Sequence, residues 1–251
     1  LGRRRQRHLH RRHGAAVNAP ARAAHIDHLV VAAASLDEGV AWCEATLGAT
    51  PGPGGAHALF GTHNRLLRLH SAVHPQAYLE VIAIDPSATP NRPPPLRRWF
   101  DLDDPILRQR LQQDGPQLVH WVASVPDIAA AWARLRALGI ERGPVIEASR
   151  ATPQGLLRWR ITVRDDGQRL FGGALPTLIQ WDDTHPADGM ADAGLHLRAL
   201  SLQHPAAERL QAALAAIGLD GVAVCPGPAG LQATLTLPGG TAVALDHTTP
   251  A

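Results

Sequence analysis

The chain has 251 residues, of which 45% are hydrophobic and 18% charged. This composition is typical of a globular protein with enough apolar surface for one large domain or two small ones. No run of about 18 apolar residues is present, which excludes a membrane-spanning helix. The two cysteines lack a CxxC or metal-ligand spacing. A buried thiol at Cys43 favours a reducing, cytoplasmic location.

The formal net charge of +2 is unevenly distributed along the chain. We expect residues 1–24 to form a disordered basic arm, because they contain seven arginines and no acidic residue. Such an arm can bind nucleic acid or anionic lipid, although a passive leader is the simpler interpretation. The rest of the chain carries 17 arginines against 22 acidic residues, which argues against a nucleic-acid partner.

The first unit, residues 25–88, begins with the sequence HIDHLVVAAASLDEGVAWCEATLG. Its apolar start predicts a strand over Ile26–Ala33. A helix follows, because Ser35 and Glu38 form an S-x-x-E capping box and Gly48 suits a left-handed C-terminal cap. A turn is expected over residues 51–55, and two further strand-like runs lie at Ala58–Leu69 and Tyr78–Ile84. The unit is therefore β-α-β-β or β-α-β-β-β.

Residues 89–117 interrupt this pattern and are predicted to link two units. Closely spaced prolines exclude regular structure at the start of the segment. A helix over Trp99–Gln113 is compatible with the sequence that follows. We interpret the segment as a linker that is partly folded onto the body.

The second unit, residues 118–185, repeats the first with the sequence VHWVASVPDIAAAWARLRALG. Ser35 lies seven positions after His28, and Asp127 lies seven positions after His120. Such a repeat indicates a duplicated supersecondary unit. Strict alternation of apolar and polar residues predicts a half-buried strand at Leu156–Val163. A closing strand is expected at Thr177–Trp181.

A third and shorter unit, residues 186–251, is predicted to be a βαββ extension. Its elements are a strand at Leu195–His204, a helix at Pro205–Leu219, and strands at Ala223–Cys225 and Leu231–Leu245. Its histidine, His196, is one position away from the place equivalent to His28, and would point to the opposite face of its strand. We expect this unit to have a structural role only.

Four polar residues occupy equivalent positions in the first two units. His28 and His120 lie on the first strands, and Glu80 and Gln180 lie on the last strands. Each is surrounded by apolar neighbours, where an unpaired polar side chain is costly. Two imidazoles, a carboxylate and an amide oxygen suit a divalent transition ion such as Mn, Fe, Co, Ni or Zn. The competing interpretation of each histidine is a hydrogen-bonded core residue.

At these residues the chain resembles the vicinal oxygen chelate (glyoxalase/extradiol dioxygenase) superfamily, and within it the glyoxalase-like proteins. The similar motifs are IDHLVV, GTHNRLL, YLEVIAID, VHWVAS, LLRWRITV and LIQWDD. The resemblance implies an α+β fold, in which paired βαβββ modules form a curved mixed sheet around a central pocket. It also implies a divalent metal ion held by His28, Glu80, His120 and Gln180, and a metal-dependent lyase, isomerase or dioxygenase acting on a small molecule with vicinal oxygens.

Other residues are candidates for roles around the metal. A general base at the metal would be Glu80 or a residue outside the ligand set, because the amide of Gln180 cannot accept a proton as a base. His63 is a candidate proton shuttle and Asn64 a candidate substrate donor, although both suit a plain polar strand face. Arg158 and Arg160 could bind a carboxylate or phosphate of the substrate, and solvated arginines are the alternative. The rival function is a metal-free protein that sequesters a small molecule, and either a monomer or a homodimer is compatible with the sequence.

Overall fold

The computed structural model describes residues 23–153 and 155–248. The predicted basic arm therefore lies outside the described residues, apart from Ala23 and Ala24. The first module has the order βαβββ: β1 (His25–Ala32), α1 (Leu36–Leu47), β2 (Gly52–His57), β3 (Thr62–Arg68) and β4 (Tyr78–Ile84). The second module has the same order: β5 (Gln117–Ser124), α3 (Ile128–Ala137), β6 (Val145–Thr152), β7 (Gly155–Thr162) and β8 (Thr177–Trp181).

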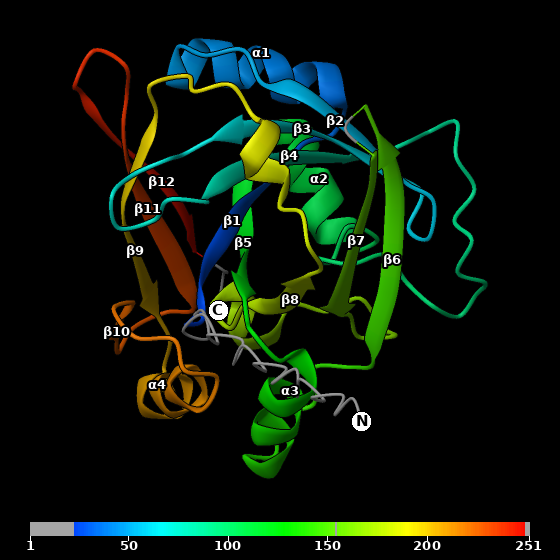
Figure 1. The fold of residues 1–251 in the computed structure, drawn as a ribbon, viewed down its shortest axis with the longest axis vertical. Coiled ribbons are helices and arrows are strands. Elements are labelled where there is room, and N and C mark those ends of the chain that lie inside the picture. Colours follow the sequence, from blue (N-terminus) through cyan, green and yellow to red (C-terminus); the bar gives the residue numbers. More distant parts are fainter. Residues whose placement is uncertain (1–22, 154, 249–251) are drawn as a thin grey trace, which may run out of the picture.

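The two modules share one eight-stranded mixed sheet, with the strand order β2-β3-β4-β1-β5-β8-β7-β6. The modules meet at its centre, where β1 pairs antiparallel with β5. The sheet curls until its edge strands β2 and β6 come into contact, which gives a nearly barrel-shaped body (Figure 1). The predicted α+β class of paired βαβββ modules around a curved sheet is confirmed.

Helix termini follow the capping signals in the sequence. The Ser35 side chain accepts a hydrogen bond from Glu38 N at the start of α1, and Gly48 ends the helix with a φ of 67°. Only glycine adopts this left-handed conformation without a steric penalty. The Asp127 side chain caps α3 by accepting from Ala130 N. None of the helices in the described ranges is long and apolar enough to cross a membrane.

Strand alternation divides the apolar residues between two cores. Alternate residues of β1, for example Leu29 and Val31, point to the convex side of the sheet and pack with α1, α3 and the C-terminal unit. Val30 and Ala32 point to the concave side, where they join residues from the segment that connects the modules. Trp99 and Phe100 of this segment lie inside the curved sheet. The concave side is therefore filled by aromatic and aliphatic side chains except where polar groups replace them.

The connecting segment differs from the prediction at its start. The helix α2 (Pro105–Asp114) begins six residues later than the expected Trp99, since Asp104 caps it and Pro105 occupies its first turn. Proline favours the first turn of a helix because it has no backbone N–H to donate. Phe100 and Asp101 instead have positive φ angles of 58° and 59°. This turn directs the neighbouring Trp99 ring into the concave core.

The first module also differs from the prediction at its second strand. Residues 51–55 were expected to form a turn, whereas β2 starts at Gly52 and pairs antiparallel with β3. The predicted single strand at Ala58–Leu69 contains the turn between β2 and β3 and then β3 itself.

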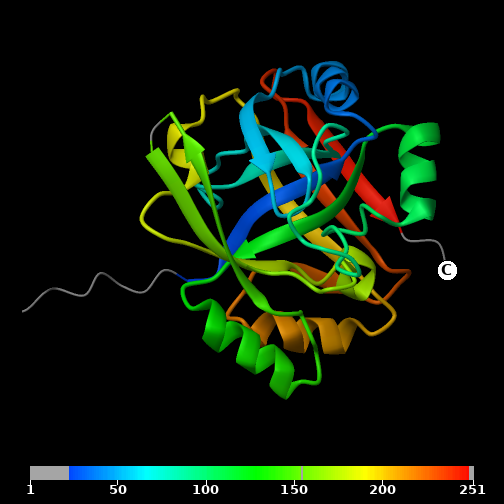
Figure 2. The same cartoon turned by 90° about the vertical axis from the view of Figure 1, so that its right-hand side faces the viewer.

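The C-terminal unit forms a second sheet with the strand order β10-β9-β11-β12. Its elements are β9 (His196–Gln203), α4 (Ala207–Ala216), β10 (Ala223–Cys225), β11 (Gly230–Thr236) and β12 (Ala242–Thr248). The prediction of a single last strand was wrong, because residues 237–241 form a tight turn that makes β11 and β12 a hairpin. Figure 2 shows α4 beside α3 at one end of the molecule, opposite α1.

Candidate functional site

A polar cluster interrupts the apolar concave face of the first module. His28 on β1, Asn64 on β3 and Glu80 on β4 each occupy a concave-facing position and are each 5% exposed. They surround a cavity of about 30 Å³, which has room for one or a few water-sized groups. Buried polar groups in an apolar core are costly unless they are hydrogen-bonded. The hydrogen-bond partners of these side chains therefore determine which of them can bind a ligand or accept a proton.

Asp27 is the most deeply buried carboxylate of the cluster. Its Oδ1 lies 2.6 Å from His28 Nδ1, and its Oδ2 accepts from Trp181 Nε1 at 2.8 Å and lies 3.1 Å from His185 Nε2. Burial by itself would raise the pKa of Asp27, but hydrogen bonds from His185 and His28 outweigh burial and hold the pKa well below its usual value. Asp27 is therefore an ionised acceptor that fixes the rings around it.

The hydrogen bonds also assign the proton positions on two histidines. His185 Nδ1 accepts from Ala187 N, so its proton lies on Nε2 and is donated to Asp27. His28 Nδ1 can only donate to the Asp27 carboxylate. The His28 ring also stacks on Tyr78, with ring centroids 4.6 Å apart. His28 therefore directs Nε2 toward Glu80.

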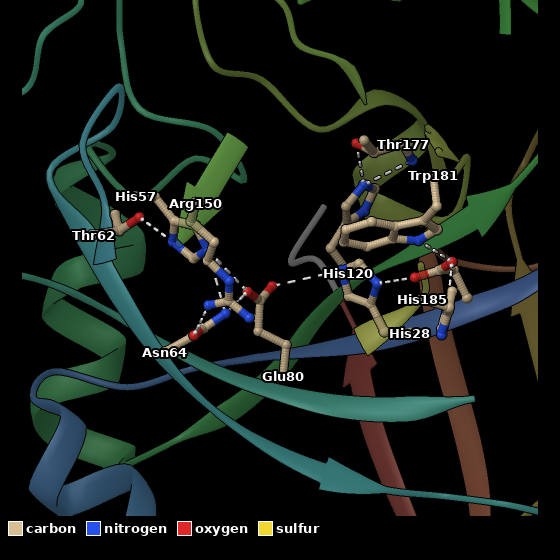
Figure 3. Close-up of polar contacts among 11 residues, drawn as sticks. His28, His57, Thr62, Asn64, Glu80, His120, Arg150, Thr177, Trp181 and His185 are labelled. Atoms are coloured by element: carbon tan, nitrogen blue, oxygen red, sulfur yellow. Dashed lines mark hydrogen bonds and ion pairs between the residues drawn. The ribbon is translucent and has the colours of Figure 1, made fainter. Parts of the chain in front are cut away.

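Glu80 is held on its other side by Asn64 and His57. Asn64 Nδ2 donates to Glu80 Oε1 at 2.6 Å and lies 3.3 Å from His57 Nε2. His57 Nδ1 lies 3.1 Å from Thr62 Oγ1, so the neutral ring donates from Nδ1 and accepts at Nε2. Burial, together with the charge of Arg150, lowers the pKa of His57 to about 3. Figure 3 shows Glu80 between this pair and His28.

Arg150 joins the polar cluster from the second module. Its Nη1 donates to Asn64 Oδ1 at 3.4 Å, and Gly55 N donates to the same oxygen at 2.8 Å. Because two donors hold the Asn64 oxygen, its amide nitrogen must face Glu80. A Cβ at the neighbouring Gly54 would lie 2.1 Å from Asn64 O, so β2 can approach β3 here only with glycine. The orientation of Asn64 thus depends on both modules.

The distance between His28 and Glu80 is the unusual feature of the cluster. His28 Nε2 lies 3.6 Å from Glu80 Oε2, which is longer than a hydrogen bond. With Nδ1–H donating to Asp27, Nε2 either carries a second proton or presents a lone pair toward the carboxylate. Two facing acceptors repel each other. The gap therefore suits a group that donates to one or both, such as a hydroxyl or an acidic C–H of a bound molecule.

His120 has both ring nitrogens engaged elsewhere. Nδ1 lies 3.0 Å from Gly173 O, and Nε2 accepts from Thr177 N at 3.2 Å. Burial, followed by the charges of Arg142 and Arg169, lowers the pKa of His120 well below its usual value, which keeps the ring neutral. His120 lines a different small cavity from His28 and Glu80.

Gln180 points away from the cavity. Its Oε1 accepts from Ile128 N at the start of α3, on the convex side of the sheet. The concave-facing residues of β8 are Ile179 and Trp181, which line the cavity with Glu80. Because side chains alternate along a strand, one residue of difference in register places Gln180 on the opposite face.

The remaining candidate residues lie at different cavities of the structure. Asn64 lies in the cluster, whereas His63 faces the other way and lines a separate hollow beside Ser35 and Leu36. Arg158 and Arg160 line a cleft of about 440 Å³, together with Phe60 and other residues. The cleft shares His57, Trp99 and Trp159 with the small cavity. A ligand in the cleft would therefore lie next to the polar cluster.

The four residues predicted to bind a metal do not form one ligand set here. His28 and Glu80 face the same cavity, whereas the lone pair of His120 Nε2 and the oxygen of Gln180 each accept a backbone N–H. In the described part of the chain, no group of three or more His, Cys, Asp or Glu side chains is arranged to hold a metal ion. Metal binding by the predicted set stays a prediction.

Several residues of the cluster were not found from the sequence. Asp27 directly precedes His28 in HIDH, and a carboxylate beside a functional histidine is a signal that could have identified it. His57 lies between the residues expected to form a turn and the strand predicted from Ala58, so no element was predicted for it. His185 is 158 positions from Asp27, and no local pattern marks it. Trp181 was predicted only as the end of the closing strand, and its indole nitrogen donates to Asp27.

Comparison with known proteins gives matches to one family and to solved structures. The family model described as a glyoxalase-like domain matches residues 26–218. A solved hypothetical protein from Staphylococcus aureus is 13% identical with a TM-score of 0.55, and the match covers 82% of this chain and 87% of that one. At this identity the similarity shows the fold alone. No curated protein matches the chain.

Methylmalonyl-CoA epimerases are also among the similar structures. A variant from Streptomyces coelicolor in complex with 2-nitronate-propionyl-CoA is 18% identical with a TM-score of 0.41, over 65% of this chain and 99% of that one. The enzyme from Mycobacterium tuberculosis is 20% identical with a TM-score of 0.36, over 70% of this chain and 96% of that one.

Proposed function

The chain belongs to the glyoxalase-like domain family of the vicinal oxygen chelate superfamily, and from this premise we propose that it is an enzyme that moves a proton on a small, oxygen-rich molecule. Glu80 is the proposed proton acceptor. Lyases and isomerases of carbonyl compounds use this chemistry, because removal of a proton next to a carbonyl gives an enediolate-like anion.

The gap between His28 Nε2 and Glu80 Oε2 is the observation that carries the proposal. It measures 3.6 Å and lies in a cavity that shares walls with the larger cleft. A substrate carbon or hydroxyl placed beside this pair of atoms would contact both Glu80 Oε2 and His28 Nε2. A base must lie within hydrogen-bond reach of the proton that it removes.

The rest of the cluster would support this step. Asn64 donates to Glu80 Oε1, which leaves Oε2 as the oxygen that accepts the proton. Asp27 accepts from His28 Nδ1 and holds the ring so that Nε2 faces the bound molecule, where an Nε2–H would donate to an oxygen that gains negative charge. The bond electrons of the removed proton would move toward that oxygen. Trp99 and Trp159 border the cavity and limit the access of water.

The substrate would occupy the cleft of about 440 Å³. This volume lies in the usual range for small-molecule sites. The aromatic rings of Phe60 and Trp99 are stacked with centroids 3.9 Å apart and provide an apolar wall. Arg158 and Arg160 are proposed to contact an anionic group of the substrate. The need for a divalent ion (Mn, Fe, Co, Ni or Zn) stays a prediction.

Deuterium exchange tests the proposal directly. Purified protein, with its metal content determined by mass spectrometry, would be incubated in D₂O with a panel of small 2-hydroxycarbonyl and 1,2-dicarbonyl compounds. We expect NMR to show deuterium incorporation next to a carbonyl, and the Glu80→Gln variant to lose this activity by about 100-fold or more. Glu208→Gln, an exposed substitution on α4, is the matched control and should exchange at the wild-type rate.

A metal-free binding protein is the second candidate, and the aromatic walls of the cleft favour it. Under this function a compound of the panel would bind with the same affinity to wild type and to Glu80→Gln, without exchange in either. Exchange that persists unchanged in Glu80→Gln would contradict the proposed role of this carboxylate. Metal removed with a chelator should abolish exchange only if the metal-dependent prediction is correct.

A further inference from the structure

Arg150 is a cation at the polar cluster that takes no part in the proposed proton transfer. It lines the same small cavity as His28 and Glu80. The other two candidate arginines, Arg158 and Arg160, line the wider cleft instead. Among the residues that the structure describes, none of the carboxylates forms an ion pair with Arg150. A guanidinium that lines a substrate cavity, and that is not paired with a carboxylate of the protein, suits an anionic group of a ligand.

The guanidinium of Arg150 keeps N–H groups free for a ligand. Within the described part of the chain its hydrogen-bond partner is Asn64 Oδ1, which accepts from Nη1 at 3.4 Å, near the upper limit for such a bond. Arg150 is only partly buried, and the side-chain atoms that are buried without a partner belong to other residues. The N–H groups of Nε and Nη2 are therefore accessible to solvent and can donate to a ligand.

Arg150 lies one amide group away from the proposed base. Asn64 accepts from Arg150 through Oδ1 and donates to Glu80 Oε1 through Nδ2 at 2.6 Å. Figure 3 shows the Arg150 side chain next to His57 and Asn64. Its charge acts inside the cluster, since burial and then Arg150 lower the pKa of His57. An acid group held by Arg150 would therefore be only a few bonds away from a carbon that faces Glu80 Oε2.

We propose that Arg150 binds the carboxylate of the substrate and makes the site specific for small oxo acids, an inference that rests on the proposed function for the position of the reacting carbon. The planar guanidinium matches the two oxygens of a carboxylate. A phosphate dianion is less suitable, because the Glu80 carboxylate would repel its second charge. The carbonyl oxygen of the oxo acid would lie at His28 Nε2, and the rest of the molecule would lie in the cleft.

The same contact would assist removal of the proton. A carboxylate near the reacting carbon opposes deprotonation, because the product carries a second negative charge. A guanidinium that holds the carboxylate offsets this repulsion. The proton moves to Glu80, and the electron pair of the C–H bond moves onto the neighbouring carbonyl oxygen. Loss of Arg150 should therefore lower kcat as well as affinity, whereas loss of a group that only binds the substrate would raise KM alone.

Binding of pyruvate and of its neutral methyl ester tests the inference in the full chain. The two compounds have the same carbonyl and the same exchangeable protons but differ in charge. In NMR titrations we expect the wild type to bind pyruvate about 10- to 100-fold more tightly than methyl pyruvate. Arg150→Met should remove this preference, whereas Arg65→Met, an exposed substitution next to Asn64 on β3, should keep it. Equal affinities in the wild type, binding of neither compound, or a preference that survives in Arg150→Met would overturn the proposal.

Gly55→Ala moves the guanidinium without removing its charge. A Cβ at Gly55 would lie 2.5 Å from Arg150 Nη1 and 3.2 Å from Arg150 Cδ, so the arginine side chain must shift. This variant should reduce the preference for pyruvate, and it decides the outcome if Arg150→Met does not fold. Gly52→Ala, whose Cβ would meet nothing closer than 3.6 Å, is the matched control and should keep the preference.

Deuterium exchange with the same two compounds separates this inference from the proposed reaction. A wild type that prefers pyruvate but exchanges no deuterium into either compound would refute the proton transfer and support the carboxylate contact of Arg150. Exchange that requires Glu80 but has the same kcat/KM for both compounds would support the proton transfer and refute the role of Arg150. In Arg150→Met, we expect kcat for exchange into pyruvate to fall; a raised KM with unchanged kcat would refute the assistance to proton removal.

Discussion

Replacing Asp27 with asparagine removes the negative charge on which the polar cluster depends. The carboxylate accepts from His28, Trp181 and His185, at 2.6, 2.8 and 3.1 Å, and is fully buried. A hydrogen bond to a charged group stabilises a protein by about 1.5–3 kcal/mol, against about 1 kcal/mol for a neutral one. Over three bonds the variant should lose about 3 kcal/mol of unfolding free energy. For a chain of this size, that corresponds to a decrease of about 6–12 °C in melting temperature.

The substitution also changes the proton position on His28. An asparagine that keeps its oxygen toward Trp181 and His185 must turn its amide nitrogen toward His28 Nδ1. His28 would then have to accept at Nδ1 and carry its proton on Nε2. Nitrogen-15 NMR of the imidazoles distinguishes the two tautomers. We therefore expect the loss of stability and the change of tautomer to occur together.

Urea unfolding at a series of pH values measures the effect and its sign. Because the pKa of Asp27 is lowered in the folded state, its contribution is fully present above pH 3.8 and is lost as the pH falls below that value. The difference between wild type and Asp27→Asn should be constant from pH 7 to about pH 4 and shrink below it. Asp220→Asn, an exposed substitution, should change stability by less than about 0.5 kcal/mol. A loss below about 1 kcal/mol with the His28 tautomer unchanged would refute the reasoning.

Three further predictions follow from single contacts. Burial lowers the pKa of His57 to about 3, so the wild type should lose unfolding free energy as the pH falls from 6.5 toward 3. In urea unfolding, His57→Gln should reduce the dependence of the unfolding free energy on pH by about 1.4 kcal/mol per pH unit. Gly54→Ala should cost about 1–3 kcal/mol, because the new Cβ would lie 2.1 Å from Asn64 O, whereas Gly52→Ala meets nothing closer than 3.6 Å and serves as the control. Gln180→Ala should cost about 1 kcal/mol in thermal unfolding by leaving an α3 N–H unpaired, with no change in metal content; a loss of bound metal would instead support the predicted ligand role.

The fold could be predicted well because it depends on local and repeated signals. The Ser35 and Asp127 caps, the glycine after α1 and the two equivalent strands are all encoded within short stretches of sequence. The duplication then implied paired modules. The hairpin of β11 and β12 was missed, since the turn at residues 237–241 divides a stretch in which apolar residues recur on both sides.

The site was harder to predict because it depends on register and on distant contacts. Matching Gln180 to Glu80 by order along the chain could not show which face each residue occupies. The pairing of β5 with β8 aligns Val122 with Thr177, and this register leaves Ile179 and Trp181 on the concave face. The contact between Asp27 and His185 forms only when the segment after β8 folds back over β1.

These differences indicate that the two modules contribute different groups to the pocket, although the repeat would predict equivalent groups from each. The first module supplies Asp27, His28 and Glu80, which are the groups able to hold or accept a proton. The second module supplies walls and orientation, since Trp159 borders the cavity and Arg150 fixes Asn64. Its own histidine, at the position equivalent to His28, is bonded to the backbone beside a buried arginine. A duplicated fold therefore places equivalent residues at equivalent positions of its two modules. The hydrogen bonds that each residue makes then decide whether its side chain can still bind a ligand or transfer a proton.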